Sequence, residues 1–349
     1  MEDAEFYYEN GLRLYNLGRY SEAVGSFDQA HEKLIENNQA SDELLACTLN
    51  AKGAALNSIA DTPSREQMEK KYTQAIKLFT EAIKIFENIV QKMPVDKPYL
   101  HGELALVHHN KGYALGHLGK YQKALVCFEK ARKSFDNYHG EKYSTEKADL
   151  WRNIGWCRAM KNLRDSKLDY EHGFKEVVEA FTRANREDKS YAIAYNTAGY
   201  VYELYKKSDK AIEQYKKAID IDPRLALPWY NMGYTIWSRV QRKQRNNSNN
   251  KNLGKDQYEE QYQKAITYID YSIKLDPNNP WAWYYKGYVL YEGLGKHDWA
   301  LSSFNKALEI DPNFLYALYC IGLICHDKQE YDEAIRYFDK SLDCTEQIE

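Results

Sequence analysis

The chain has 349 residues, of which 44% are hydrophobic and 28% charged, so it has enough apolar side chains to bury a long core. Its net charge of −3 gives no general reason to expect binding to nucleic acid or to an anionic membrane. No stretch approaches the roughly 18 consecutive apolar residues of a membrane span, and the acidic first residues lack the apolar segment of a secretion signal. We therefore expect a cytoplasmic protein without membrane contact, whose six scattered cysteines stay reduced.

The composition favours helices. Proline occurs only 8 times and tyrosine 31 times, and the mean hydropathy is −0.74. Runs of Val, Ile and Thr that would indicate strands are hard to find, whereas apolar residues recur at helical spacing. The sequence thus predicts an all-α fold.

One pattern recurs along the chain from its first residues to its last. A glycine lies inside an apolar stretch and is followed by a small residue, an aromatic residue and a second small residue, as Gly199 is followed by Ala211, Tyr215 and Ala218. Small residues let two helices approach closely while the aromatic ring fills the space between them, so each unit is a predicted helix hairpin. The eight glycines are Gly11, Gly53, Gly112, Gly155, Gly199, Gly233, Gly287 and Gly322.

Asp-Pro pairs follow several of these hairpins, as at Asp222-Pro223 and Asp311-Pro312. Aspartate is a good N-cap, and proline is favoured at the first position of a helix. We therefore expect each pair to begin the first helix of the next hairpin.

With 34 residues between Gly199 and Gly233 and 35 between Gly287 and Gly322, the chain resembles the tetratricopeptide repeat (TPR) family over essentially its whole length. The resemblance implies an all-α, right-handed superhelical solenoid of antiparallel helix hairpins, with 1–349 as a single solenoid. Its eight repeats, called first to eighth below, span about 4–41, 42–98, 99–145, 146–189, 190–223, 224–278, 279–313 and 314–349.

The sixth repeat contains a polar insertion at about 239–258, with an asparagine-rich tract at 246–250. A basic run, from Arg239 to Arg245, precedes that tract. One interpretation is a contact with nucleic acid through 239–255. The other is a solvated helix end, where cations interact favourably with the helix dipole, and we expect this second case.

No motif of a nucleotide-binding loop, a zinc protease or a serine hydrolase occurs. Cys320, Cys325 and His326 come closest to a metal cluster, but residues five apart on a helix diverge by about 140°. We expect no catalytic residue, no metal and no cofactor, and hence not an enzyme.

The resemblance also implies which residues face inward. Counting the glycine as position 8, positions 2, 5, 6, 9 and 12 of the first helix line a concave groove in this family. Asparagine side chains there can pair with the backbone of an extended peptide, and aromatic rings add rigid contact area. Alternatively, the asparagines bond to the next helix and the rings pack against the neighbouring hairpin. The predicted groove residues are Asn110, Asn153, Asn196, Asn231, Tyr113, Trp156, Tyr200, Tyr234 and Tyr288, with Arg152 as the one inward cation.

The pattern does not match the carboxylate clamp with which some TPR proteins bind chaperone tails, because position 9 is never asparagine in these repeats. We expect a non-catalytic scaffold or adaptor that binds an extended segment of another protein in the groove. An alternative is a regulatory sensor whose superhelix changes shape on binding. The chain is expected to be a monomer or a weak end-to-end dimer.

Overall fold

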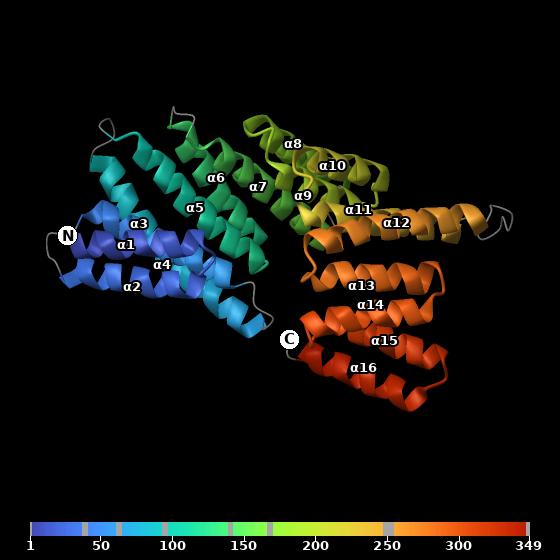
Figure 1. Ribbon diagram of the computed structural model, residues 1–349. Helices are drawn as coiled ribbons and strands as arrows, with labels where there is room; N and C mark the ends of the chain where they lie inside the picture. The colour runs from blue at the N-terminus through green and yellow to red at the C-terminus, as the bar shows by residue number, and fades with distance from the viewer. Residues whose placement is uncertain are drawn as a thin grey trace. The chain divides into compact units, whose positions relative to one another are not determined.

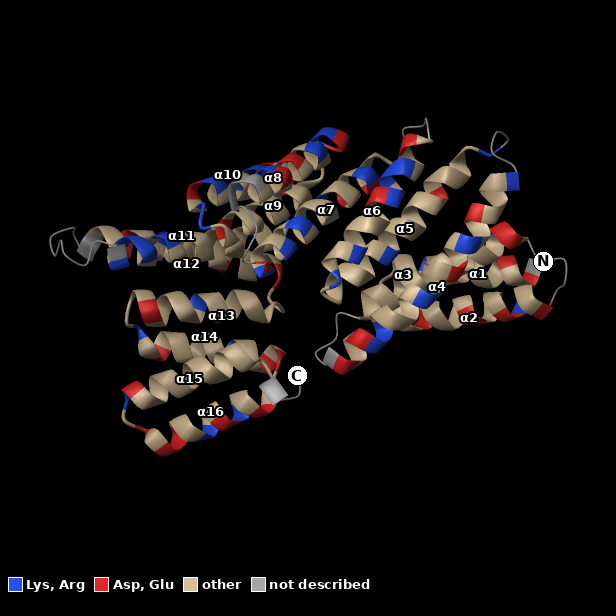
Figure 2. Cartoon of the chain, turned by 180° about the vertical axis from the view of Figure 1, so that it is seen from behind, with Lys and Arg blue, Asp and Glu red and all other residues tan. Residues whose placement is uncertain are grey.

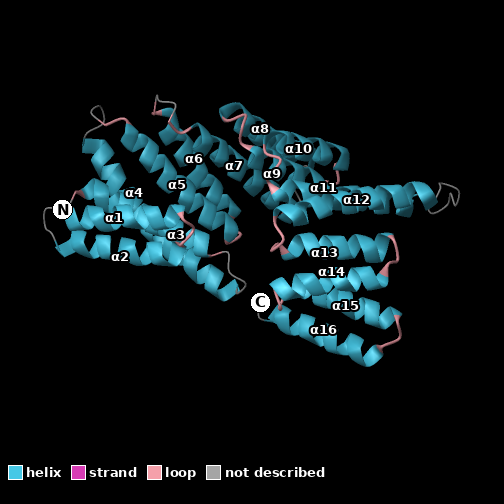
Figure 3. Cartoon of the chain, viewed as in Figure 1, coloured by secondary structure: helices cyan, strands magenta, loops and turns pink. Residues whose placement is uncertain are grey.

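A computed structural model describes residues 2–36, 41–60, 65–92, 97–138, 142–165, 170–246 and 255–346. Within these ranges the chain forms sixteen α-helices, one short π-helix and no strand, which confirms the predicted all-α class (Figures 1 and 3). Most of the asparagine tract, residues 247–250, lies outside the described ranges. No helix in the described ranges is both long and apolar enough to span a bilayer.

The helices pair into eight antiparallel hairpins, as predicted, and the chain divides into two compact units of four hairpins each. The N-terminal unit, residues 1–188, comprises α1 (Glu2–Asn16), α2 (Tyr20–Glu36), α3 (Asp42–Ile59), α4 (Arg65–Lys92), α5 (Tyr99–His117), α6 (Tyr121–Asp136), α7 (Ser144–Arg164) and α8 (Tyr170–Glu187). The C-terminal unit, residues 189–349, comprises α9 (Ala192–Leu204), α10 (Ser208–Ile221), α11 (Ala226–Asn246), α12 (Lys255–Leu275), α13 (Pro280–Tyr288), the π-helix η1 (Val289–Gly293), α14 (His297–Ile310), α15 (Leu315–Asp327) and α16 (Tyr331–Glu346).

In seven of the eight hairpins, the central glycine faces a ring of the second helix. A Cβ atom at Gly112 would lie 2.5 Å from the buried ring of Phe128, which is closer than a Cβ atom can approach. In the other repeats the nearest ring atom would lie 2.5–3.0 Å from such a Cβ atom, except in the sixth, where Gly233 faces the Ile269 side chain at 2.6 Å. The glycine–ring pairs are Gly11–Phe27, Gly53–Phe79, Gly112–Phe128, Gly155–Phe181, Gly199–Tyr215, Gly287–Phe304 and Gly322–Phe338.

The Asp-Pro pairs end helices and do not begin them, so that prediction was wrong. Asp222 and Asp311 are the C-terminal caps of α10 and α14. The Asp222 carboxylate accepts a hydrogen bond from the Arg224 backbone N–H at 3.0 Å, and the next helix begins only at Ala226. An aspartate that bonds the backbone two residues ahead forms a turn, which is the alternative to capping for this side chain.

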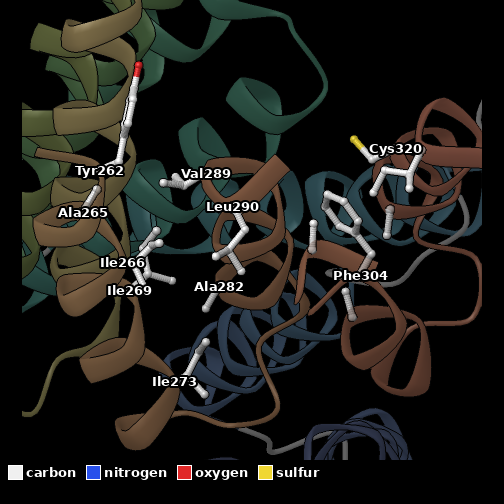
Figure 4. Packing of buried hydrophobic residues seen from close by; sticks show 14 of the residues in the cluster. Tyr262, Ala265, Ile266, Ile269, Ile273, Ala282, Val289, Leu290, Phe304 and Cys320 are labelled. Carbon is white, nitrogen blue, oxygen red and sulfur yellow. The ribbon is translucent and has the colours of Figure 1, made fainter. Parts of the chain in front are cut away.

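The C-terminal unit has one continuous core. Ile266 and Ile269 of α12 pack with Ala282 of α13 and Leu290 of η1 (Figure 4). Phe304 of α14 belongs to the same cluster, which reaches from α10 to α16. Each hairpin therefore completes its core by stacking on its neighbour, as repeat proteins require.

The first helices of neighbouring hairpins also contact one another. These contacts join α1, α3, α5 and α7 in the N-terminal unit, and α9, α11, α13 and α15 in the C-terminal unit. Over the described ranges, the second helices of neighbouring hairpins make no such contact. Each unit therefore curves with its first helices on the inner side, and these helices carry the predicted groove positions.

Candidate binding surface on the first helices

Neighbouring repeats are joined by a regular contact between two inner positions. In the N-terminal unit, the Asn110 Nδ2 at position 6 of the third repeat donates to the Asn50 Oδ1 at position 5 of the second, at 3.0 Å. In the C-terminal unit, the Asn231 Nδ2 donates to the Asn196 Oδ1 at 3.1 Å in the same way. Position 6 of one repeat thus lies against position 5 of the repeat before it.

Each asparagine pair uses one donor and one acceptor. An amide side chain has two N–H donors and a carbonyl oxygen, so the Asn110–Asn50 pair leaves an oxygen on Asn110 and an N–H pair on Asn50. Asn110 and Asn231 are half-buried, whereas Asn153 and Asn196 are buried. The four predicted asparagines therefore differ in how much of the amide reaches the inner surface.

Asn153 belongs to a buried polar cluster in the N-terminal unit. Its Nδ2 lies 2.8 Å from the His109 Nε2 and 3.2 Å from the Asp149 Oδ2. Arg152 donates from Nε to the Asp149 Oδ1 at 2.7 Å. Burial lowers the pKa of His109, against the opposing effect of the Asp149 carboxylate. The predicted inward cation is therefore engaged with a carboxylate of its own helix.

Aromatic residues of the N-terminal unit form a stack between hairpins. The His117 ring lies 5.6 Å from Trp156 at an interplanar angle of 24°, and 4.3 Å from Tyr113. The Tyr121 ring lies 5.9 Å from Trp156 at an interplanar angle of 81°. The two predicted position-9 aromatics of this unit, Tyr113 and Trp156, are thus linked through His117 and are half-buried.

The C-terminal unit carries a larger aromatic surface, which we define by six residues of its first helices. Tyr285 on α13 is at its centre, with ring centroids at 4.7 Å from Tyr234, 5.7 Å from Tyr230 and 6.0 Å from Trp281. Trp281 in turn lies 5.1 Å from Tyr316 on α15. The aromatic surface comprises Tyr200, Tyr230, Tyr234, Trp281, Tyr285 and Tyr316. It contains the predicted residues Tyr200 and Tyr234.

The hydroxyl groups of this surface influence one another. Burial, with Tyr200 as the next contribution, raises the pKa of Tyr230 to about 12. Burial also raises the pKa of Tyr285, and its neighbours Tyr234, Tyr230, Tyr200 and Tyr316 add to the effect. The phenols therefore stay protonated at any physiological pH and can donate hydrogen bonds. Tyr288, the last predicted position-9 residue, lies beside Trp237 at 4.9 Å.

Part of the aromatic surface is exposed. Tyr200 is 45% exposed, Tyr316 44% and Trp281 37%. Position 2 holds an exposed large apolar residue in all four repeats of this unit: Ile193, Leu227, Trp281 and Tyr316. The groove residues predicted from the sequence do not include Tyr285 and Tyr316. Counting positions 6 and 2 from Gly287 and Gly322 would have found both.

The basic run of the sixth repeat is helical. α11 continues to Asn246, so Arg239 and Arg242 lie on a helix that packs against the fifth repeat. Arg239 donates to Asp209 at 2.7 Å, and Arg242 donates to the buried Glu203 at 2.8 Å. Two of the cations considered for nucleic-acid contact thus form ion pairs within the C-terminal unit.

The described ranges contain no group of three or more His, Cys, Asp or Glu side chains placed to hold a metal ion. Cys320 and Cys325 are both buried. Burial raises the pKa of Cys320 to about 12, so it behaves as a small apolar side chain of the core.

Family models match the chain in three places. A model described as TPR repeat matches residues 206–238, and one described as tetratricopeptide repeat matches 105–133. A third, described as anaphase-promoting complex, cyclosome, subunit 3, matches 259–341. The matches fall in both units.

Curated relatives and solved structures show the same likeness. The TPR repeat-containing protein MJ1428 of Methanocaldococcus jannaschii is 23% identical over 94% of this chain and 51% of its own length. Superkiller protein 3 of Schizosaccharomyces pombe is 25% identical over 49% of this chain and 14% of its own length. The chain thus spans about half, or less, of the length of these relatives.

Among solved structures, the human IFIT1 dimer with m7Gppp-AAAA aligns with 99% of this chain and 78% of its own, with a TM-score of 0.55 at 14% identity. At that identity the likeness concerns the fold alone. The family-model matches, the relative MJ1428 and the eight stacked hairpins agree. The chain contains tetratricopeptide repeats in both of its units.

Proposed function

We propose that this chain is a non-catalytic scaffold in which the inner face of each unit binds an extended segment of a partner protein. The observation that carries the proposal is the exposed aromatic and apolar side chains on the first helices of the C-terminal unit. Exposed apolar groups that share one surface are typical of interaction sites. Rigid rings also lose little conformational freedom on binding.

The predicted groove residues have two roles in this proposal. The half-buried amides of Asn110 and Asn231, with the rings of Tyr113, Trp156, Tyr200, Tyr234 and Tyr288, contact the ligand. Asn153, Asn196 and Arg152 hold neighbouring groups in place, because the two asparagines are buried and Arg152 is paired with Asp149. Affinity then increases by modest contacts added repeat after repeat.

Lys, Arg, Asp and Glu are interspersed along the helices of both units (Figure 2). The nine residues of α13 contain one charged side chain, Lys286. A ligand held there is selected by shape and hydrogen bonding rather than by net charge. The ion pairs of Arg239 and Arg242 weaken the case for nucleic acid. Residence in the cytoplasm and a monomeric or weakly dimeric state stay predictions.

The proposal can be tested with peptides selected from a displayed random library on the whole protein. Their dissociation constants are then measured by fluorescence anisotropy for the wild type and for Tyr200→Ala. Loss of an exposed ring from the binding surface should weaken binding about tenfold.

Trp299→Ala is the matched control, because Trp299 is 70% exposed but lies on the second helix α14. It should bind the selected peptides as the wild type does. If Trp299→Ala abolished peptide binding and Tyr200→Ala did not, the binding site would not be on the inner face.

A further inference from the structure

The hydroxyl groups of the aromatic surface come from four different repeats yet lie close together. Tyr200 is on α9, Tyr230 on α11, Tyr285 on α13 and Tyr316 on α15. The Tyr285 ring lies 5.7 Å from Tyr230, and the Tyr316 ring lies 5.1 Å from Trp281. Burial raises the pKa of Tyr200, and Tyr316 adds to the effect, although two repeats separate the two residues along the stack. The curvature of the C-terminal unit therefore gathers these phenols on one patch of its inner face.

None of these four hydroxyls has a hydrogen-bond partner among the described residues of the unit. They are phenols, and burial favours their protonated form. Each can therefore donate a hydrogen bond to an acceptor that a ligand supplies. The patch thus combines flat apolar rings with several uncommitted donors.

The patch contains almost no charge. Of the twenty inner positions in the four repeats of this unit, only one, Glu203, holds a carboxylate, and none holds Lys or Arg. Glu203 is buried and accepts hydrogen bonds from Ser208, Ser238 and Arg242. A highly charged ligand, whether positive or negative, would therefore find no free side chain of opposite charge on this patch.

Among extended peptides, a polyproline II helix fits these properties best. Its backbone carbonyls are not bonded within the helix, and proline has no N–H, so it needs donors from its receptor and few acceptors. Its rings dock on aromatic side chains, and its extended shape is largely formed before binding. An ordinary extended peptide would present one N–H per residue and would need as many acceptors as donors.

We propose that the aromatic surface of the C-terminal unit binds a proline-rich segment in the polyproline II conformation. Trp281 and Tyr316, whose rings lie 5.1 Å apart, provide the platform on which proline rings stack. The hydroxyls of Tyr200, Tyr230 and Tyr285 donate to the ligand's carbonyl oxygens. This inference rests on the proposed function, because it names the ligand class of the same inner face.

The test uses the whole protein and two fluorescein-labelled probes, an oligoproline peptide and a Gly/Ser peptide of equal length. The first is a preformed polyproline II helix and the second a flexible coil. The wild type should bind oligoproline and leave the Gly/Ser peptide unbound in an anisotropy titration. Equal binding of both probes would overturn the proposal.

Three variants locate the contact. Tyr316→Ala should weaken oligoproline binding about tenfold through loss of a stacking ring. Tyr200→Phe removes only a hydroxyl and should weaken it about fivefold, as for one lost donor. Trp299→Ala on α14 should bind as the wild type does. If Tyr316→Ala loses helicity by circular dichroism, Tyr316→Leu replaces it.

Peptides from the random library separate this proposal from the broader one. If they contain no proline, bind the wild type and lose affinity with Tyr316→Ala, while oligoproline does not bind, then the inner face binds peptides but not polyproline II. If neither library peptides nor oligoproline bind, both proposals fail. Oligoproline binding that is unchanged in Tyr316→Ala and Tyr200→Phe would place the site elsewhere and overturn the assignment.

Discussion

At Gly112 the two helices of the third hairpin leave no room for a side chain. A Cβ atom would lie 2.5 Å from the Phe128 ring, which is fully buried. Gly112→Ala should therefore lower the free energy of unfolding by about 1–3 kcal/mol, as overpacking of a core does. Chemical denaturation followed by circular dichroism measures this change.

Gly25→Ala is the control, since a Cβ atom there meets nothing within 4 Å on the exposed face of α2. This substitution should raise stability by about 0.5–1 kcal/mol, because alanine restricts the unfolded chain and favours the helix. If both variants changed stability in the same direction, the close contact with Phe128 would not be the reason for glycine at position 112.

His108 gives the N-terminal unit a dependence on pH. Burial, helped by Lys130 and Lys111, lowers its pKa to about 4, and its Nδ1 has no hydrogen-bond partner among the described residues. The Glu87 carboxylate lies 3.9 Å from the Nε2, but it is half-exposed, so water screens its charge. The side chain is thus buried in its neutral form.

Protonation should therefore destabilise the fold. In the unfolded chain the pKa of histidine is about 6.5, so below that pH the unfolded state binds more protons than the folded state. Stability should be full above about pH 6.5 and fall by about 3 kcal/mol as the pH decreases to about 4. His108→Gln, which cannot titrate, should flatten this decline in urea titrations at several pH values. A decline as steep in His108→Gln as in the wild type would assign the pH dependence to another group.

At the level of elements, the seventh repeat accommodates one extra residue in a π-helix. In four repeats the residue with positive φ in the turn between the two helices lies seven positions after the central glycine, as Lys206 follows Gly199. In the seventh repeat that residue is Gly295, eight positions after Gly287. The π-helix Val289–Gly293 lies between them and explains the 35-residue spacing to Gly322.

Deletion of the exposed Glu292 should convert this π-turn into an α-turn and restore the register of the other repeats. The melting temperature should change by no more than about 4 °C, because no buried side chain is lost. Deletion of the exposed His326 from α15, which has no extra residue, should destabilise far more by shifting its turn out of register. Similar melting temperatures for the two deletions would rule out the π-turn as the place of the extra residue.

The hairpins could be predicted because each depends on a local pattern, a glycine and a ring at fixed spacing. The Asp-Pro turns could not, because an aspartate side chain can either cap a helix or close a turn, and the competing bonds involve the same atoms. The 28-residue length of α4 has no marker in sequence, since helical residues simply continue beyond the hairpin contact. At the candidate site, the first-helix positions were predictable. The hydrogen bonds from Asn110 to Asn50 and from Asn231 to Asn196 could not be predicted, because they depend on how neighbouring repeats stack.

On the scale of the whole molecule, each unit has buried clusters of its own. The cluster of the C-terminal unit extends from α10 to α16. The clusters of the N-terminal unit are centred on side chains such as Phe27, Phe79 and Phe128. Repeat proteins gain stability from each hairpin and from each interface between neighbouring hairpins. A group of four complete hairpins therefore contains most of the interactions that stabilise it.

The C-terminal unit, residues 189–349, should therefore fold when it is produced alone. We expect a helical circular dichroism spectrum and a cooperative thermal transition. A fragment that begins at Ser208 is the matched control, because it keeps α10 but removes its partner α9 and the Gly199 that faces the Tyr215 ring. That fragment should melt at a lower temperature, since Tyr215, buried in the intact unit, would become exposed. If the fragment 189–349 were unfolded, or no more stable than the shorter fragment, folding of this half would depend on residues before 189. The two compact units would then not be independently stable.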